Sequence, residues 1–301
     1  MNTGRIVILG QFDGVHLAHR VLIEKAVHLA TEEDKKVYLI SFSGNYKNEV
    51  LKKTDQKLLL YDEEKKELLK SLGVDKVILL PFSYEIRNMS PKEFTQKIVI
   101  EKYNASNIFC GFNYHFGKNA KGNAKELESI AKNFNIKTFI LPAVKIDRKE
   151  VSSSMIKKLL SDGKLKEANQ YLGYEYKISG EVVFGNQIGR TIGFKTANLL
   201  PPKNKIIPIN GVYQTVVNVK NNRYESMTNI GKRPTVDGKE KIIETNIFAF
   251  DKDIYGEKIS ISFKEKIRDE IQFSGLGELK NQLKNDKLKV KELFKKNKER
   301  I

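Results

Sequence analysis

The sequence contains one cysteine, Cys110, and no tryptophan in 301 residues. A single cysteine excludes an internal disulfide and is typical of proteins in a reducing compartment. No window approaches the roughly 18 consecutive apolar residues of a membrane-spanning helix, and residues 1–5 lead into an apolar run rather than a secretory segment. We therefore expect a cytoplasmic protein without a membrane partner. Cys110 itself lies in an apolar run, so we expect a buried structural thiol.

Acidic residues are scarce relative to basic ones. The sequence has 37 aspartates and glutamates and 54 lysines and arginines, which gives a formal net charge of +17. This balance favours anionic partners, either nucleic acids or small phosphorylated molecules. Lysines are spread along the whole chain. The densest basic run, residues 284–300, has Leu288, Leu293 and Phe294 at helical spacing and no aromatic interleaving for base stacking. We expect small polyanions rather than a nucleic acid as partners.

The length, with 40% apolar and 30% charged residues, suits two domains better than one. In the first half, short apolar runs alternate with helical patterns, which predicts a doubly wound α/β fold with a parallel sheet. The expected strands are residues 6–9, 36–42, 76–81, 108–111 and 137–142, and the expected helices are residues 21–30, 62–71 and a segment capped by Ser90. Ligands bind beyond the carboxyl ends of such strands, so the loops after Leu9, Phe42, Pro81 and Cys110 should converge.

The first motif is the turn at residues 10–19, where an apolar strand pattern passes into a helical pattern through glycine. Unpaired N–H groups and the helix dipole make such a helix start favourable for a phosphate. His16 and His19 are three residues apart, so both imidazoles lie on one helical face. The alternative is that the two histidines only cap or pack. A zinc site is disfavoured, because no third cysteine or histidine is near.

These residues resemble the HxGH nucleotidyltransferases, and the wording FDGVH at residues 12–16 resembles bacterial bifunctional riboflavin kinase/FAD synthetases. The resemblance implies a Rossmann-like domain that transfers AMP from ATP to FMN, with His16 and His19 on the ATP phosphates. It places Gly10, Phe12, Asp13 and Gly14 in the same phosphate site. Ala18 departs from the family, which has glycine there.

Two further stretches carry the resemblance through the first half. Residues 111–122 form a long loop rich in aromatic residues and glycine, similar to the family's flavin and ATP loop, which implies that Asn113 and Phe116 bind flavin. A lysine-tipped hairpin is the alternative. Ser152, Ser153, Ser154 and Lys157 resemble the phosphate-binding signature SSTxIR, with lysine replacing arginine. The alternative for the serines is that they only cap a helix, whose pattern runs from Ile156 to Ala168.

After Gly173 the pattern changes to short alternating runs separated by turns. Strands are expected at residues 176–183, 211–219, 223–229, 244–250 and 258–263. Ile259, Ile261 and Phe263 alternate with serines, which indicates a sheet with one buried face. We expect a small antiparallel β-barrel followed by the C-terminal helix. The predicted domains are therefore residues 1–173 and 174–301.

Residues 185–198 resemble the riboflavin kinase signature GRTIGFPTAN, and residues 208–213, 229–235 and 268–273 match further family stretches in order. The resemblance implies that Thr196 and Asn198 hold Mg²⁺, which prefers oxygen ligands, and that Glu244 is the general base. It also implies ATP contacts from Gly189, Arg190 and Gly193, and flavin contacts from Arg268 and Glu270. Lys195 stands where the family has proline, and Asn246 where it has histidine.

The prediction is a bifunctional enzyme of FAD biosynthesis that uses Mg²⁺ and ATP, with riboflavin, FMN and FAD as substrates and products. Two alternatives stay open. One is a single-activity paralogue, in which Ala18 and Lys157 mark a degenerate synthetase or Lys195 and Asn246 a degenerate kinase. The other is a flavin-binding or nucleic-acid-binding regulator, which the net charge of +17 suggests.

Overall fold

The computed structural model describes residues 4–43, 57–185, 188–235 and 238–299. The chain divides into two compact units, Met1–Met155 and Ile156–Ile301. The division falls before the predicted boundary at residues 173 and 174. The reason is that the segment following Met155 packs on the strands of the second unit, as described below.

Unit 1 is built on a five-stranded parallel sheet with the order β3-β2-β1-β4-β7. Its strands are β1 (Arg5–Leu9), β2 (Val37–Phe42), β3 (Lys76–Leu80), β4 (Ala105–Gly111) and β7 (Lys137–Leu141). The parallel sheet predicted from the apolar runs is confirmed. Cys110 is a free, fully buried residue in β4, as expected of a structural thiol.

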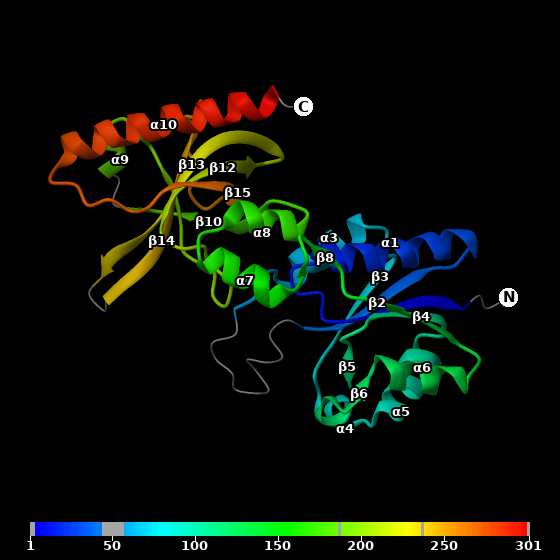
Figure 1. Ribbon diagram of the computed structural model, residues 1–301. Coiled ribbons are helices and arrows are strands. Elements are labelled where there is room, and N and C mark those ends of the chain that lie inside the picture. Colours follow the sequence, from blue (N-terminus) through cyan, green and yellow to red (C-terminus); the bar gives the residue numbers. More distant parts are fainter. Residues whose placement is uncertain (1–3, 44–56, 186–187, 236–237, 300–301) are drawn as a thin grey trace. The chain divides into compact units, whose positions relative to one another are not determined.

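Helices cover both faces of this sheet (Figure 1). Alternate residues of β1 face opposite layers, since Ile6 and Ile8 belong to one core cluster and Val7 and Leu9 to the other. The first layer contains α1 (Leu17–Glu32) and α3 (Asp62–Ser71); the second contains α4 (Tyr84–Asn88), α5 (Pro91–Glu93), the π-helical η1 (Phe94–Lys102) and α6 (Ala124–Lys132). Ser90 caps α5 as predicted, accepting a hydrogen bond of 3.2 Å from the Glu93 amide.

The loop after β4 contains a short hairpin, β5 (His115–Phe116) with β6 (Gly122–Asn123), and the turn η2 (Lys118–Ala120) lies between them. The hairpin alternative is therefore also present in the predicted ligand loop. Gly117 has φ of +73°, and a Cβ there would lie 2.9 Å from the Pro91 nitrogen. The Lys118 amide donates to the Met89 carbonyl over 2.7 Å, which holds the hairpin against the start of α5. A second small hairpin pairs β8 (Lys145–Ile146) with β9 (Lys149–Glu150).

Two helices, α7 (Ser153–Ser161) and α8 (Leu165–Leu172), replace the single helical pattern expected after the serines. The break falls at Gly163, whose φ of +75° ends the first helix. Asn169 ties α8 to the strands of unit 2. Its Nδ2 donates to the Phe263 carbonyl over 2.8 Å, and its Oδ1 accepts from the Tyr176 amide over 2.8 Å.

Unit 2 is a closed antiparallel barrel with the strand order β10-β11-β14-β13-β12-β15, as predicted (Figure 1). The strands are β10 (Tyr176–Val183), β11 (Ala197–Leu199), β12 (Gly211–Val219), β13 (Asn222–Thr235), β14 (Gly238–Ile247) and β15 (Lys258–Arg268), and the short helix α9 (Ile188–Thr191) precedes β11. The sequence missed β11 because its three residues lie inside the glycine-rich signature. The bounds of β13, β14 and β15 also differ from the predicted ones.

The C-terminal helix α10 (Leu276–Lys298) packs on the barrel through Val290 and Phe294, which are buried. The helical spacing of Leu288, Leu293 and Phe294 is confirmed, since all three lie on α10, but Leu288 is 61% exposed. The other face of the same barrel strands carries a buried row of hydroxyl groups. Thr228 lies at its centre, 2.8 Å from Thr215 and 2.6 Å from Thr245 between the Oγ1 atoms.

Candidate active sites

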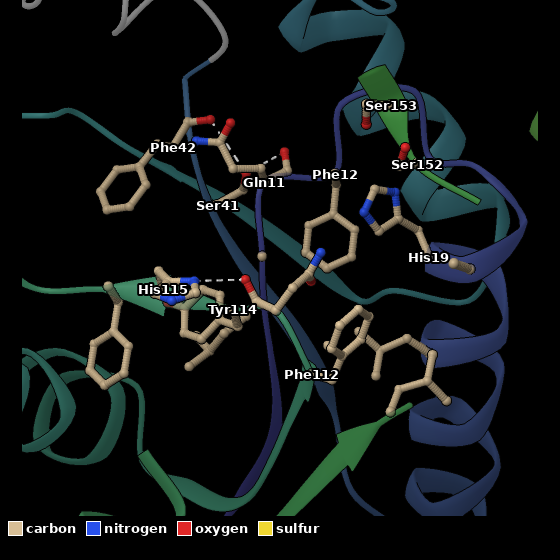
Figure 2. A pocket seen from close by; sticks show the side chains of 18 of the residues that line it. Gln11, Phe12, His19, Ser41, Phe42, Phe112, Tyr114, His115, Ser152 and Ser153 are labelled. Atoms are coloured by element: carbon tan, nitrogen blue, oxygen red, sulfur yellow. Dashed lines mark hydrogen bonds between the residues drawn. The ribbon is translucent and has the colours of Figure 1, made fainter. Parts of the chain in front are cut away.

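A cavity of about 730 Å³ opens at the carboxyl ends of the unit 1 strands. Gly10, Phe42, Phe82 and Gly111 all line it, so the four loops converge as predicted. Figure 2 shows His19, Ser152 and Ser153 on one side of Phe12 and the Tyr114–His115 segment on the other. Of the predicted residues, those lining the cavity are Gly10, Phe12, His16, His19, Asn113, Phe116, Ser152, Ser153 and Ser154.

The turn between β1 and α1 has an unusual backbone. Phe12 and Val15 have φ of +52° and +38°, which is unfavourable for residues with a side chain. Both are fully buried, so packing holds the turn in this form. It delivers His16 to the N-cap of α1, whose first turn contains no acidic residue. No acidic side chain of the first turn therefore neutralises the positive end of the α1 dipole, which favours an anion in the cavity.

The rings of His16 and His19 stack with centroids 3.7 Å apart and planes 14° apart. Burial lowers the pKa of His16 to about 4. Burial, and then the neighbouring His16 and Lys65, lower the pKa of His19 well below its usual value. The Nδ1 atoms of both rings are buried without a hydrogen-bond partner among the residues described. The neutral imidazoles can each donate one N–H to a phosphate oxygen.

Lys65 is a residue of this region that the sequence did not single out. It lies on α3, is 3% exposed, and its Nζ is 3.3 Å from both Asp62 Oδ1 and the Phe42 carbonyl. Burial lowers the pKa of Lys65, and Asp62 and Asp13 oppose that shift. The available signal was the spacing of four between Lys65 and the buried Leu69, which places both on one side of the helix.

Asp13 and the serines connect the two segments of unit 1 that the sequence predicted to bind phosphate. Ser153 Oγ donates to the Asp13 carbonyl over 2.6 Å, and Ser152 Oγ accepts from the Met155 amide at 3.3 Å. The Asp13 carboxylate accepts from the Leu59 amide at 2.9 Å. Asp13 and Gly14 therefore shape the turn and do not line the cavity, and Lys157 follows one turn later on α7, also outside the lining.

Aromatic rings line the side of the cavity formed by the β4–β6 loop. Phe116 is buried, and its ring stacks on Tyr114 with centroids 5.3 Å apart and planes 9° apart. His115 Nδ1 lies 2.9 Å from the Asn113 carbonyl oxygen, to which it donates, so Nε2 is the nitrogen left to face a ligand. Phe112, which is 45% exposed, completes the rim. This wall offers flat apolar surface together with amide and imidazole groups.

The barrel holds a second cavity of about 130 Å³. Arg190, Thr196 and Asn198 line it, together with Lys195 and Asp251. Asn198 is 3% exposed, and its Oδ1 is buried without a hydrogen-bond partner among the described residues. A buried amide oxygen beside a threonine hydroxyl fits a hard cation such as Mg²⁺, which binds through a few protein oxygens plus phosphate and water.

Glycine is required by geometry in the turn before this cavity. The Phe194 amide donates to the Gly189 carbonyl over 2.7 Å, and a Cβ on Gly189 would collide with the Phe194 carbonyl. Gly193 has φ of +82°, the left-handed region that glycine adopts freely. Asn186 and Gln187 of the same signature lie outside the described residues.

Glu244 lies directly opposite Asn198 in the β11–β14 ladder and opposite Asn229 in the β13–β14 ladder. Side chains of directly opposed residues share one face of a sheet. Glu244 is half-buried and does not line the 130 Å³ cavity itself. The ladder thus brings the predicted base beside one of the two predicted metal ligands.

The two residues that depart from the kinase signature contact each other. Asn246 Nδ2 donates to the Lys195 carbonyl over 2.6 Å. Lys195 Nζ forms an ion pair with Asp251, and both of these side chains are exposed. The pKa of Asp251 is lowered, first by its hydrogen bond from Lys195.

Arg268 and Glu270 lie elsewhere on the barrel and line neither cavity. Arg268 makes three hydrogen bonds to Asp286 of α10, the shortest 2.7 Å from Nη2 to Oδ2. Glu270 Oε2 accepts from Asn210 Nδ2 at 2.8 Å. The structure therefore joins Arg268 to α10 and Glu270 to the segment before β12.

A doubly wound unit with a histidine-flanked helix start, followed by a closed barrel with a glycine-rich turn, defines a two-site transferase of the nucleotide-dependent class. Residues 1–155 match the FAD synthetase family, and residues 172–294 match the riboflavin kinase family. The chain belongs to the bifunctional riboflavin kinase/FMN adenylyltransferase family. It is 32% identical to the Bacillus subtilis protein of that name over 94% of this chain and 90% of the relative. It is 31% identical to the Buchnera aphidicola (Schizaphis graminum) protein of that name, over 98% of this chain and 95% of the relative.

A solved structure also matches almost the whole chain. It is described as a macrolide-efflux protein from Streptococcus pneumoniae, and it is 33% identical with a TM-score of 0.88, covering 97% of this chain and 95% of that one. In the part of this chain that the structure describes, no helix has both the length and the apolar character needed to cross a membrane.

Proposed function

We propose that this chain phosphorylates riboflavin to FMN in unit 2 and adenylylates FMN to FAD in unit 1, using ATP in both reactions. The observation that carries the proposal is that two chemically different groups of residues, each suited to an anion, lie in one chain. One is the stacked pair His16 and His19 at the start of α1, and the other is the Thr196–Asn198 segment of the barrel.

In unit 1, an FMN phosphate oxygen attacks the α-phosphorus of ATP, and the bond to the β-phosphate oxygen breaks to release pyrophosphate. Negative charge accumulates on the transferring phosphate and on the leaving group. His16 and His19 donate N–H groups to these oxygens, aided by the N-terminus of α1. Ser152, Ser153 and Ser154 hold the pyrophosphate. Asn113 and Phe116 orient the flavin. No covalent enzyme intermediate is required, because positioning and charge stabilisation suffice.

In unit 2, the ribityl 5′-hydroxyl attacks the γ-phosphorus of ATP, and ADP leaves. Glu244 accepts the hydroxyl proton as the oxygen–phosphorus bond forms. The backbone around Gly189, Arg190 and Gly193 binds the phosphates. Thr196 and Asn198 would hold Mg²⁺, which neutralises phosphate charge when bound. The orphaned Oδ1 of Asn198 supports this assignment.

Arg268 and Glu270 belong to the proposed riboflavin site as residues that shape it. Asp286 accepts hydrogen bonds from the guanidinium of Arg268, and the Arg268 Cζ atom lies 6.0 Å from the centroid of the Phe273 ring. We also propose that the protein acts in the cytoplasm, where the free thiol of Cys110 is in keeping with a reducing compartment. Macrolide efflux is not proposed, because both sites are suited to phosphate-bearing ligands.

The test is to incubate the protein with riboflavin, ATP and Mg²⁺ and to separate the flavins by chromatography. We expect FMN followed by FAD. FMN alone would contradict the adenylyltransferase assignment, and unchanged riboflavin would contradict the kinase assignment. A nucleic-acid-binding regulator would instead retain RNA or DNA at low salt and lose it steeply as salt rises.

A further inference from the structure

Two side chains that are distant in sequence hold Lys195, one at its backbone carbonyl and one at its ammonium group. Asn246 Nδ2 binds its carbonyl oxygen at 2.6 Å, and Asp251 binds its ammonium group. Lys195, Thr196 and Asp251 all line the 130 Å³ cavity. Lys195 directly precedes Thr196, so a rotation of its backbone would move the Thr196 hydroxyl.

The strand register brings the same elements together. Ala197 pairs with Thr245, and Asn198 pairs with Glu244, in the β11–β14 ladder. Asn246 is the next residue of β14 beyond Thr245, and it shares a face of that strand with Glu244 because side chains two residues apart point the same way. The ladder therefore contains the proposed base, one proposed metal ligand and Asn246, and Thr196 directly precedes it.

The Asn246 side chain is 8% exposed, and its Oδ1 is buried without a hydrogen-bond partner among the residues described. An unsatisfied buried acceptor is unfavourable and offsets much of what the amide gains from its one donated bond. The net contribution of Asn246 to folding stability is accordingly small. The effect of the contact is to fix the position of the Lys195 carbonyl.

We propose that Asn246 is a positioning residue of the kinase site, which holds the Lys195 carbonyl so that Thr196 and Asn198 present their oxygens toward the same metal–nucleotide complex. The Lys195–Asp251 ion pair is a second, weaker restraint, because both partners are exposed. This inference rests on the proposed kinase function of unit 2.

The test compares Asn246→Asp and Asn246→Ala with the unmodified residue in the full chain. Aspartate keeps the shape but has no donor for the carbonyl. Binding of ADP and Mg²⁺ is measured by calorimetric titration, and every protein also carries His16→Ala. Because unit 1 is then identical in all of them, a difference in affinity comes from the barrel site. We expect about tenfold weaker binding, which corresponds to about 1.4 kcal/mol. In FMN formation the KM for ATP should rise by a similar factor and kcat should change less.

Asn222→Ala is the matched control, because Asn222 Nδ2 also donates to a backbone carbonyl, that of Lys220, at an exposed turn. It should leave the binding and the KM unchanged. Adding Lys195→Pro to Asn246→Ala should recover affinity to within about threefold, since proline restricts the same backbone without restoring the hydrogen bond.

Native-like affinity and KM in both Asn246 variants would overturn the inference. A loss that proline does not recover, accompanied by a lower melting temperature of the barrel, would also overturn it, because the role would then be purely structural. An unmodified protein that forms no FMN and shows no Mg²⁺-dependent ADP binding in the barrel would instead overturn the proposed kinase function, and the inference with it.

Discussion

His16 and His19 lie one above the other at the start of α1, with ring planes only 14° apart and centroids 3.7 Å apart. Two protonated imidazoles at this separation would repel each other in a buried site, and burial already disfavours the charged forms. The pair is therefore neutral near pH 7. It can bind phosphate through N–H groups and helix dipole without carrying positive charge itself.

Replacing His16 with alanine should abolish FAD formation and spare FMN formation. The substitution removes one donor to the transferring phosphate, and the loss of one such donor lowers kcat by about 10²–10³-fold. FMN and FAD formation are measured separately, the second with FMN supplied. His28→Ala on the same helix is the control, because His28 is 74% exposed and forms an i,i+4 pair with Glu32. Equal loss of both activities in His16→Ala would contradict separate sites.

The neutral histidines also predict how stability depends on pH. The folded-state pKa of His16 is about 4 against an ordinary value of 6.5, so the unfolded chain binds more protons between these values. The free energy of unfolding of unit 1 should therefore fall as pH decreases from about 6.5 towards 4, by up to about 3 kcal/mol for this residue.

Hydrogen exchange of the β1 amides measures this dependence for unit 1. His16→Asn, which cannot titrate in this range, should have a shallower slope than the native protein. A native slope unchanged by the substitution would show that His16 is not the group responsible.

Glu244→Gln should abolish FMN formation while FAD formation from supplied FMN continues. Glutamine keeps the shape but cannot accept the proton of the ribityl hydroxyl, and loss of a general base costs about 10²–10⁴-fold. Glu265→Gln on β15 is the control, because Glu265 is also half-buried and lines neither cavity. Retention of FMN formation by Glu244→Gln would remove Glu244 from the mechanism.

Asp286→Ala should destabilise the barrel by about 3 kcal/mol, because it leaves the partly buried guanidinium of Arg268 without its charged partner. The measurement is urea denaturation, in which hydrogen exchange of the β12 and β15 amides reports the unfolding of the barrel. Glu292→Ala on the exposed face of α10 serves as the comparison and should leave the midpoint unchanged. A native-like midpoint for Asp286→Ala would show that the Arg268 contact does not hold α10 to the barrel.

Local signals predicted most of the fold. Apolar runs located the five parallel strands, and the helix start at Ser90 followed from capping chemistry. The apolar spacing in residues 284–300 predicted the C-terminal helix but not that Leu288 is exposed, because the packing of α10 on the barrel decides which apolar residues are buried. Convergence of the loops on one cavity followed from the parallel topology alone.

The parts of the sites that sequence did not reveal depend on contacts across long separations. Asn246 meets the Lys195 carbonyl, 51 residues earlier in the chain. Lys65 becomes buried only when α3 packs beside the β1–α1 turn. The Asn246 contact has no local pattern, and the spacing of Lys65 to Leu69 indicates only a shared side of α3. The histidine pair lies within one helical turn and could be predicted.

The central claim is that two independent sites act in succession, and mixing two inactivated proteins tests it most directly. Neither His16→Ala nor Glu244→Gln should convert riboflavin to FAD alone, but an equimolar mixture supplied with riboflavin, ATP and Mg²⁺ should form FAD. The first variant releases FMN and the second adenylylates it. A mixture that forms no FAD, although each variant still performs its own half-reaction, would contradict the account.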